Sequence, residues 1–592
     1  MDQEKNNISI FDKLREMLNK PLVILISITV VLVAYLLMIQ IKIGVPYWDV
    51  FNYLNNAFHF ANMGSSGVVN HLPPLIPLLT SLFFRMGYVS VDVIFILSGL
   101  IFILGIIGLY LLLNERFDST KSLTGSLIFI SLPVVMAWAV SGGIDLPGVV
   151  FSIWALYFMV IGLKKDSKFL YLVLPLLVIS ILTRYTAGLI VLPMIFYILA
   201  NFNQVKNIPQ IKKVIFGIAI EFGVLLTIFT FFILQLDTSA LFGLFFDIVT
   251  SSSSGVEDVA YNSNFLFYLQ NSLNYISLGP IQGTYRQLLN PSEGIPSVLA
   301  YIITMISVIG IFSYIYRFLS TGKEKNISQV NIINLGKITI ILVLFIGLVL
   351  SFYNKSLILS EIFLLALVYL SYRFMARERL EIDNKLALDL MFLSWFGAYF
   401  LFHGILPFKV DRYFITMAPA FTYFIVLGLS QFINELKHCT VKDNYVTNNC
   451  LSQFINELKP RINGLKSKSG LVYMAIALIC LSVTTVTYIG HTPQKTFTLD
   501  IEDASQWIKG YDPNYYNKII GSDYPNAVTW YLHKETTGAY LKYYNNTDEF
   551  ADYLQENGVY YYFDSNKSHP TLKSYRIIKE FGVVAIYEKI TP

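Results

Sequence analysis

The chain has 592 residues, of which 55% are hydrophobic and only 14% are charged. Soluble globular proteins carry about 25% charged residues, so this composition excludes an ordinary soluble protein and predicts a polytopic α-helical membrane protein. The net charge of +4 is small and argues against a nucleic-acid partner. The three cysteines form no CxxC pair, so neither a disulfide framework nor a zinc site is predicted.

Apolar runs separated by polar or basic clusters predict thirteen membrane spans, because roughly 20 apolar residues cross the hydrocarbon. The first span has no small-residue cleavage site after it and is interpreted as a retained signal anchor. The stretch 71–87 is also apolar, but it is short, proline-rich and ends near Arg85, so we expect it to lie along the interface. The predicted spans cover residues 21–43, 91–113, 121–140, 147–163, 168–183, 186–200, 213–236, 298–318, 334–352, 356–374, 386–405, 412–436 and 470–489.

The distribution of basic residues predicts the orientation of these spans in the cell membrane. With residues 1–20 in the cytoplasm, the seven cytoplasmic segments hold 26 Lys and Arg, whereas the outer segments before residue 490 hold seven. This asymmetry follows the positive-inside rule. The first loop (44–90), the long loop (237–297) and the C-terminus are then predicted to lie outside.

The region 490–592 is polar and tyrosine-rich, which predicts a separate outer domain. NKIIGSD, VYYYFD and VVAIYEKI have the pattern of strands, and NAVTWYLHKE and TDEFADYLQENG that of helices. Their alternation predicts a small α/β domain. The transmembrane module is therefore expected over 21–489. Its cytoplasmic loop 437–468 carries the second copy of a duplicated segment, LSQFINELK, which we interpret as a tolerated duplication.

Four ionisable residues from separate segments fall on the predicted outer face. Asp49 follows the first span within VPYWDVFNYLNNAFHF, residues 45–60, and Asp145 lies in AVSGGIDLPGVVF, between the third and fourth spans. Arg184, in ILTRYTAGL, separates the fifth and sixth spans, and Arg412, in FKVDRYFITMAPA, opens the twelfth. Ionisable groups at this depth are expensive and are usually retained for function.

Each of these residues also has an ordinary structural explanation. Asp49 or Asp145 could cap a helix, and Asp145 precedes a helix-opening Leu-Pro pair. Arg184 and Arg412 could extend toward lipid headgroups, and the aromatic residues near Asp49 could belong to an interfacial belt. The functional interpretation depends on their joint placement on one face.

Two acids and two arginines at an outer membrane face fit a particular chemistry. Arginine binds phosphate through a fork of charge-assisted hydrogen bonds, and a carboxylate can accept a proton from an attacking hydroxyl or amine. When the phosphate links a sugar to a lipid, the arginines would stabilise the charge that develops on the leaving lipid phosphate. The pattern therefore predicts glycosyl transfer from a lipid-linked sugar.

At these residues the sequence resembles the GT-C superfamily of multispanning glycosyltransferases. It is most similar to the polyprenyl-phosphate-sugar-dependent branch, which includes protein O-mannosyltransferases and aminoarabinose transferases. The resemblance covers roughly residues 20–490. It rests on the order of five segments: YWDVFNY, HLPPLIPLL, GGIDLPGVVFSIWALYF, LTRYTAGLIVLP and KVDRYFITMAPAF.

The resemblance implies an inverting transferase whose donor is a sugar on polyprenyl or dolichyl phosphate rather than a soluble nucleotide sugar. It implies that Asp49 is the catalytic base and that Asp145 supports the catalytic site or positions the acceptor. Arg184 and Arg412 are implied as ligands of the donor phosphate.

Three further residues are expected to bind substrate. His71 matches the polar position before the Pro-Pro pair of the family, and Trp48 and Tyr53 supply aromatic faces for a sugar. The acceptor is expected to be a protein, a glycolipid or a cell-surface glycan, and membrane lipids are expected partners.

The sequence departs from the family pattern at two places. Val50 follows Asp49 where many members carry a second acid, so the motifs require no metal, although a divalent cation stays possible. The WWD-type motif of oligosaccharyltransferases is absent from the C-terminal region, which argues against transfer of a whole oligosaccharide to asparagine.

Two other classes of function are compatible with a polytopic chain. A transporter or flippase would place its ionisable groups near the midplane and often shows repeated halves, whereas here they gather at one face. A non-catalytic membrane assembly protein would display the outer domain and would tolerate the loss of Asp49 and Arg184.

Overall fold

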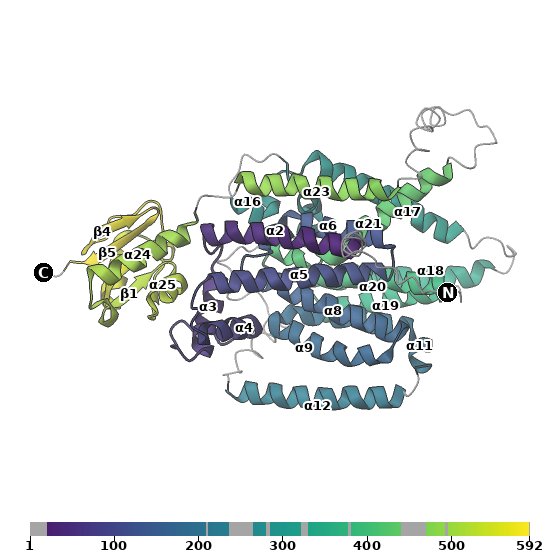
Figure 1. Cartoon of the computed structure of the whole chain (residues 1–592), viewed down its shortest axis with the longest axis horizontal. Coiled ribbons are helices and arrows are strands. Elements are labelled where there is room, and N and C mark those ends of the chain that lie inside the picture. The colour runs from purple at the N-terminus through teal and green to yellow at the C-terminus, as the bar shows by residue number, and fades with distance from the viewer. Residues whose placement is uncertain are drawn as a thin grey trace, which may run out of the picture.

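The computed structural model describes residues 20–208, 211–235, 264–279, 285–320, 330–376, 380–439, 469–491 and 495–590. Long helices lie side by side in one bundle, and a small domain with a β-sheet lies at one end of it (Figure 1). The SSSSG segment, the second LSQFINELK copy and the terminal residues 1–19 lie outside the described residues.

Helices occupy all thirteen predicted spans. Within the described ranges, eight helices are long and apolar enough to cross a membrane. These eight helices are α2 (Pro21–Ile43), α5 (Asp92–Asn114), α8 (Asp145–Lys164), α17 (Val298–Ser320), α18 (Val330–Tyr353), α19 (Leu357–Met375), α20 (Leu380–Ile405) and α23 (Ser469–His491). These elements and the small sheet domain confirm the predicted fold class.

Of the other five predicted spans, four are built from interrupted helices and one is the continuous helix α12. One interruption precedes Pro133, because proline has no N–H to continue the hydrogen-bond ladder. The elements are α6 (Ser119–Ser131) with α7 (Pro133–Trp138), η1 (Ser167–Leu172) with α9 (Val173–Thr183), η2 (Tyr185–Ile190) with α10 (Val191–Ala200), α12 (Ile211–Gln235), and η4 (Asp411–Thr416) with α21 (Ala418–Cys439). Arg184 lies at the break between α9 and η2, and Arg412 lies within η4.

The first loop folds into two short helices at the sheet-domain end of the bundle (Figure 1). They are α3 (Asp49–Phe60) and α4 (Leu75–Arg85). The predicted interfacial stretch 71–87 is therefore helical over eleven residues. Asn56 fixes the connection between the helices, because its side chain exchanges two hydrogen bonds with the backbone of Val69.

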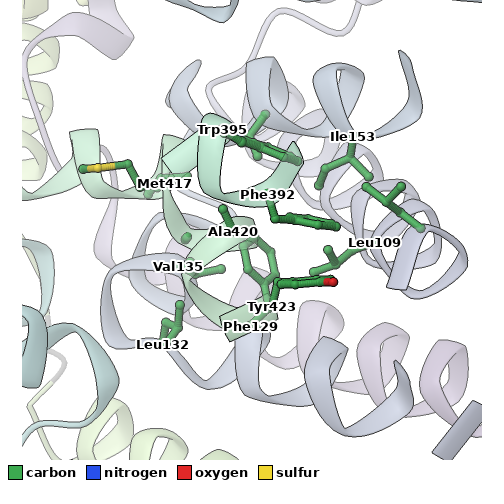
Figure 2. Packing of buried hydrophobic residues seen from close by; sticks show 14 of the residues in the cluster. Leu109, Phe129, Leu132, Val135, Ile153, Phe392, Trp395, Met417, Ala420 and Tyr423 are labelled. Carbon is green, nitrogen blue, oxygen red and sulfur yellow. The ribbon is translucent and has the colours of Figure 1, made fainter. Parts of the chain in front are cut away.

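The centre of the bundle is a dry aromatic and aliphatic core. Figure 2 shows Phe392, Trp395 and Tyr423 packed together, with Leu109 and Ile153 from other helices beside them. The rings of Phe392 and Tyr423 stack with centroids 3.9 Å apart. The Trp395 indole donates a hydrogen bond of 2.9 Å to the carbonyl of Thr416 in η4. The core thus fixes the segment that carries Arg412.

The outer domain has a five-stranded mixed sheet in the order β2-β1-β3-β5-β4. Strands β1 (Ile519–Ser522), β2 (Thr537–Gly538) and β3 (Val559–Asp564) are parallel, whereas β4 (Tyr575–Phe581) and β5 (Val584–Lys589) are antiparallel neighbours. Helices α24 (Phe497–Tyr511), α25 (Pro525–Leu532) and α26 (Thr547–Glu556) complete it. The three predicted strands and two predicted helices are present, while α24, β2 and β4 were not predicted.

The outer domain is docked on the first loop through a shared core. Thr496 donates hydrogen bonds to the carbonyls of Ile43 and Val45 at the end of α2. Farther along, Asn55 of α3 donates to the carbonyl of Asn526 at 3.1 Å. One hydrophobic cluster includes residues of α3, α24 and α25. The outer domain therefore buries one side of the helix that begins at Asp49.

Asp523, which follows β1, makes the stability of the outer domain depend on pH. Burial raises its pKa to about 6, with hydrogen bonds from Ser565 opposing and Asp564 adding to the shift. The folded state favours the protonated carboxyl, so protonated Asp523 adds to the free energy of unfolding. This stabilisation is complete below about pH 4 and is lost as pH rises through about 6. We expect the Asp523→Asn variant to be more stable than wild type at pH 7.5 but not at pH 4.

The measurement is thermal unfolding of the full chain, followed by tryptophan fluorescence at pH 4, 5.5 and 7.5. Asp552→Asn, at an exposed position of α26, is the matched control. An identical pH dependence of the unfolding temperature for wild type and Asp523→Asn would show that Asp523 does not contribute.

Candidate active site

The structure brings the four ionisable residues of the predicted outer face into one cluster. Three ion pairs connect them in the order Arg184, Asp145, Arg412, Asp49. These residues are separated by up to 363 positions in the chain. Each of them lies at or near the end of a helix, and these helix ends meet at the same place in the fold. We call these four residues the charge array.

One end of the charge array is partly open. Arg412 Nη2 donates to Asp49 Oδ2 at 2.9 Å, and the Asp49 side chain is 30% exposed. Asp49 is the first residue of α3, Trp48 holds the cap position, and no side chain caps the helix there. The carboxylate of Asp49 is therefore directed to Arg412 and to solvent instead of capping α3.

The other end of the charge array is closed. The Asp145 side chain is 1% exposed and forms an ion pair with Arg184, and its second oxygen lies 3.9 Å from Arg412 Nη1. Asp145 opens α8, but no side chain caps this helix either. Arg184 is buried and also donates from Nε to the Thr186 hydroxyl at 2.6 Å. Neither arginine is extended toward headgroups as the alternative interpretation required.

Aromatic rings surround the two guanidinium groups. The Arg412 guanidinium carbon lies 4.7 Å from the ring centre of Tyr47 and 5.9 Å from that of Trp138. Tyr413 faces both arginines, at 5.0 Å from Arg184 and 5.7 Å from Arg412. Arg412 Nε is buried without a hydrogen-bond partner. Since an unpaired buried donor is costly, this atom is a ready site for an acceptor oxygen of a ligand.

Asp411, the acid that precedes Arg412 in η4, anchors this segment and was not predicted from the sequence. Asp411 is buried and accepts hydrogen bonds from the Tyr275 hydroxyl at 2.7 Å and from the Ser292 hydroxyl and backbone. Tyr275 also stacks on Phe414, with ring centres 4.0 Å apart. Asp411 thus joins η4 to the later part of the long loop. The adjacent acid and arginine in KVDRYF are the sequence signal that could have identified it.

The three expected substrate-binding residues have different positions. Tyr53 is buried on α3, within electrostatic reach of Asp49, and burial, with Asp49 adding, raises the pKa of its hydroxyl above the usual range. Trp48 packs edge-on against Tyr524 of the outer domain, with ring centres 4.9 Å apart. His71 is exposed in the loop before α4 and makes no ion pair with the charge array. Only Tyr53 lies against the array.

The contact between Trp48 and Tyr524 makes the outer domain a support for Asp49. We expect Tyr524→Ala to lower the rate of the predicted sugar transfer about tenfold without abolishing it, because Asp49 is the predicted base and small displacements of a catalytic group are costly. The measurement is turnover with saturating donor, and Tyr516→Ala, an exposed tyrosine of the same domain, is the control. Unchanged turnover for Tyr524→Ala would show that the outer domain does not position Asp49.

Gly148 allows Arg184 to approach α8. A Cβ at position 148 would lie 2.8 Å from the Cβ of Arg184, which is too close for any pair of real side chains. The hydroxyls of Ser152 and Ser180 donate to the Gly148 carbonyl at 3.0 and 2.8 Å, so the backbone there has little freedom to shift.

We expect Gly148→Ala to move Arg184 away from Asp145 and to destabilise the protein by about 1–3 kcal/mol. The unfolding temperature and the turnover rate should both fall. Gly188→Ala is the matched control, because a Cβ there meets its nearest neighbour at an ordinary 3.7 Å. If the two alanine variants were equally stable, the close packing at Gly148 would be unimportant.

No group of three or more His, Cys, Asp or Glu that could hold a metal ion occurs within the described residues. Both acids of the charge array are instead paired with arginine. The geometry thus supplies carboxylates held by guanidinium groups beside a cage of aromatic rings.

Residues 71–230 match the model of a protein family described as dolichyl-phosphate-mannose-protein mannosyltransferase. No curated protein matches the chain by sequence. The fold is similar to that of ArnT from Cupriavidus metallidurans bound to undecaprenyl phosphate, with a TM-score of 0.56, 12% identity and coverage of 95% of this chain and 97% of that one. ArnT in the apo state gives a TM-score of 0.53, 11% identity and the same coverage.

The archaeal oligosaccharyltransferase AglB from Archaeoglobus fulgidus gives a TM-score of 0.49, 13% identity and coverage of 94% of this chain and 70% of that one. The family match and the ArnT-like fold confirm the predicted resemblance to the GT-C glycosyltransferases. The chain is a multi-pass membrane protein with an ArnT-like fold, and residues 71–230 resemble the dolichyl-phosphate-mannose-protein mannosyltransferase family.

Proposed function

We propose that this protein transfers a sugar from a polyprenyl- or dolichyl-phosphate donor to a hydroxyl or amine acceptor, with Asp49 as the base. The observation that carries the proposal is the charge array, in which a partly exposed carboxylate lies 2.9 Å from an arginine that is itself surrounded by aromatic rings. The bound undecaprenyl phosphate of the structurally similar ArnT supports a lipid-phosphate donor.

In the proposed reaction, the acceptor oxygen or nitrogen attacks the anomeric carbon from the face opposite the phosphate. Its proton passes to Asp49, and the bond between the anomeric carbon and the phosphate oxygen breaks. The lipid phosphate leaves with the electron pair of that bond, so the configuration inverts.

Arg412 is suited to stabilise the leaving phosphate. Its Nε has no hydrogen-bond partner, and its guanidinium group is held by Asp49, Asp145 and the faces of aromatic rings. A preorganised donor in a site shielded from water is worth far more than one in bulk solvent. Arg184 lies deeper, and we infer that it supports the phosphate site by holding Asp145 and the ring of Tyr413.

Asp145 is nearly inaccessible, so a direct role as acceptor base does not suit it. We assign it to positioning, because it lies between the two arginines and compensates their charge. We further propose that the array and the domain 490–592 lie outside the cytoplasm and residues 1–20 lie inside. The asymmetry in the basic residues supports this orientation.

The experiment uses the full chain in lipid nanodiscs with polyprenyl-phosphate sugars, and it measures release of polyprenyl phosphate. A parallel reaction with nucleotide sugars tests the donor class. We expect release from the lipid-linked donor only. Movement of the intact donor across a vesicle membrane without release would indicate a flippase, and neither activity with any lipid-linked sugar would indicate an assembly protein.

A further inference from the structure

A polar pocket of about 400 Å³ lies at the junction between the bundle and the outer domain. Its walls come from the end of α2, the start of α5, helix α24 and the end of α25. In Figure 1 the ends of α2 and α5 face the outer domain. None of its lining residues belongs to the charge array, so the pocket is a separate feature of the same end of the bundle.

An apolar groove of about 540 Å³ adjoins this pocket. It runs over the first turns of α5 and the connection from α4, with Tyr88, Ile96 and Leu100 among its exposed lining residues. Helix α5 is long and apolar enough to cross a membrane, and we infer from this that these side chains contact acyl chains near the membrane boundary. Val89, Ser90 and Asp92 line both the groove and the polar pocket, so the two spaces are adjacent.

The charged groups of the pocket favour a ligand that carries a cation. Two carboxylates line it, Asp92 at the start of α5 and Glu502 on α24. Burial raises the pKa of Glu502, and the nearby Asp503 and Asp92 add to this shift. A protonated amine between them would relieve this repulsion.

One cation is already present at the edge of the pocket. Lys509 lines it, and its Nζ donates to the carbonyl of Tyr531 at 2.8 Å, which leaves two further donors for an anion. His533 completes this side, with its ring stacked on Phe58 at 4.6 Å between centres. The pocket lining thus combines two carboxylates with one positive group.

We propose that this groove and pocket bind a membrane phospholipid with a zwitterionic, amine-bearing headgroup. An acyl chain lies in the groove along α5, the amine lies between Asp92 and Glu502, and the phosphate faces Lys509. Such a lipid would link the bundle to the outer domain. The inference does not depend on the proposed transfer reaction, because it concerns other residues and is tested by binding.

The probe is phosphatidylethanolamine compared with phosphatidylglycerol of identical acyl chains, titrated into the delipidated full chain in detergent. Binding is measured by native mass spectrometry. We expect wild type to bind the amine lipid about tenfold more tightly, which corresponds to one lost charge-assisted contact for the anionic lipid. Equal affinity, or preference for phosphatidylglycerol, would overturn the proposal.

Two variants locate the bound lipid. Asp92→Asn combined with Glu502→Gln is expected to remove the preference for the amine lipid, and Ile96→Trp, which fills the groove, is expected to weaken both lipids. Asp503→Asn changes the neighbouring acid, which does not line the pocket, and should bind as wild type does. A preference that persists in the double variant would place the lipid elsewhere. If the double variant does not fold, Glu502→Gln alone decides between these outcomes.

Discussion

Asp49→Asn is expected to reduce sugar transfer by about 10²- to 10⁴-fold, which is the usual contribution of a general base. Asparagine keeps the size of the side chain and an oxygen for Arg412, but it cannot take the acceptor proton. Because the Asp49 side chain is 30% exposed, the loss of its ion pair should cost less than about 1 kcal/mol of stability. The measurement is release of polyprenyl phosphate together with thermal unfolding.

Asp503→Asn is the control for this variant, since it removes an outer acid that is exposed and far from the charge array in the chain. It should retain the wild-type rate. Wild-type turnover in Asp49→Asn would remove Asp49 from the mechanism, and the base would then have to be sought elsewhere in the first loop.

Asp145→Asn is expected to affect stability far more than Asp49→Asn does. Its side chain is 1% exposed and pairs with the buried Arg184, and breaking a buried ion pair from one side typically costs about 3–5 kcal/mol. Most of that cost comes from the arginine left without a counter-charge. We therefore expect a large fall in the unfolding temperature together with loss of transfer.

A double-mutant cycle separates this explanation from simple additivity. Arg184→Gln should also destabilise the protein, whereas Asp145→Asn combined with Arg184→Gln should be more stable than the sum of the two single changes predicts. Additive effects would mean that the two side chains do not depend on each other.

The fold could be predicted because its signals are local. Apolar runs of about 20 residues and the positions of lysine and arginine identify spans by composition alone. They did not show that the twelfth span is interrupted near residue 417, because tertiary packing decides where a marginal helix breaks. Helix α24 was missed because its buried residues pack against β4, β5 and α25. The sequence alone does not show that these elements lie beside it.

The four members of the charge array could be named because each lies at the end of an apolar run, where a charge is unusual. Their order could not be predicted, since it depends on the crossing of helices far apart in the chain. Asp411 was overlooked because its partners, Tyr275 and Ser292, lie in a loop that has no pattern of its own. Substrate binding by Trp48 and His71 stays a prediction; Trp48 packs on the outer domain and His71 is exposed.

The central claim is that the charge array holds the phosphate of the lipid donor, and a structure of the full chain bound to undecaprenyl phosphate tests it most directly. The account predicts phosphate oxygens within hydrogen-bond distance of Arg412, with Asp49 facing the space from which an acceptor would enter. A phosphate bound at a position that neither Arg412 nor Arg184 can reach would contradict the account.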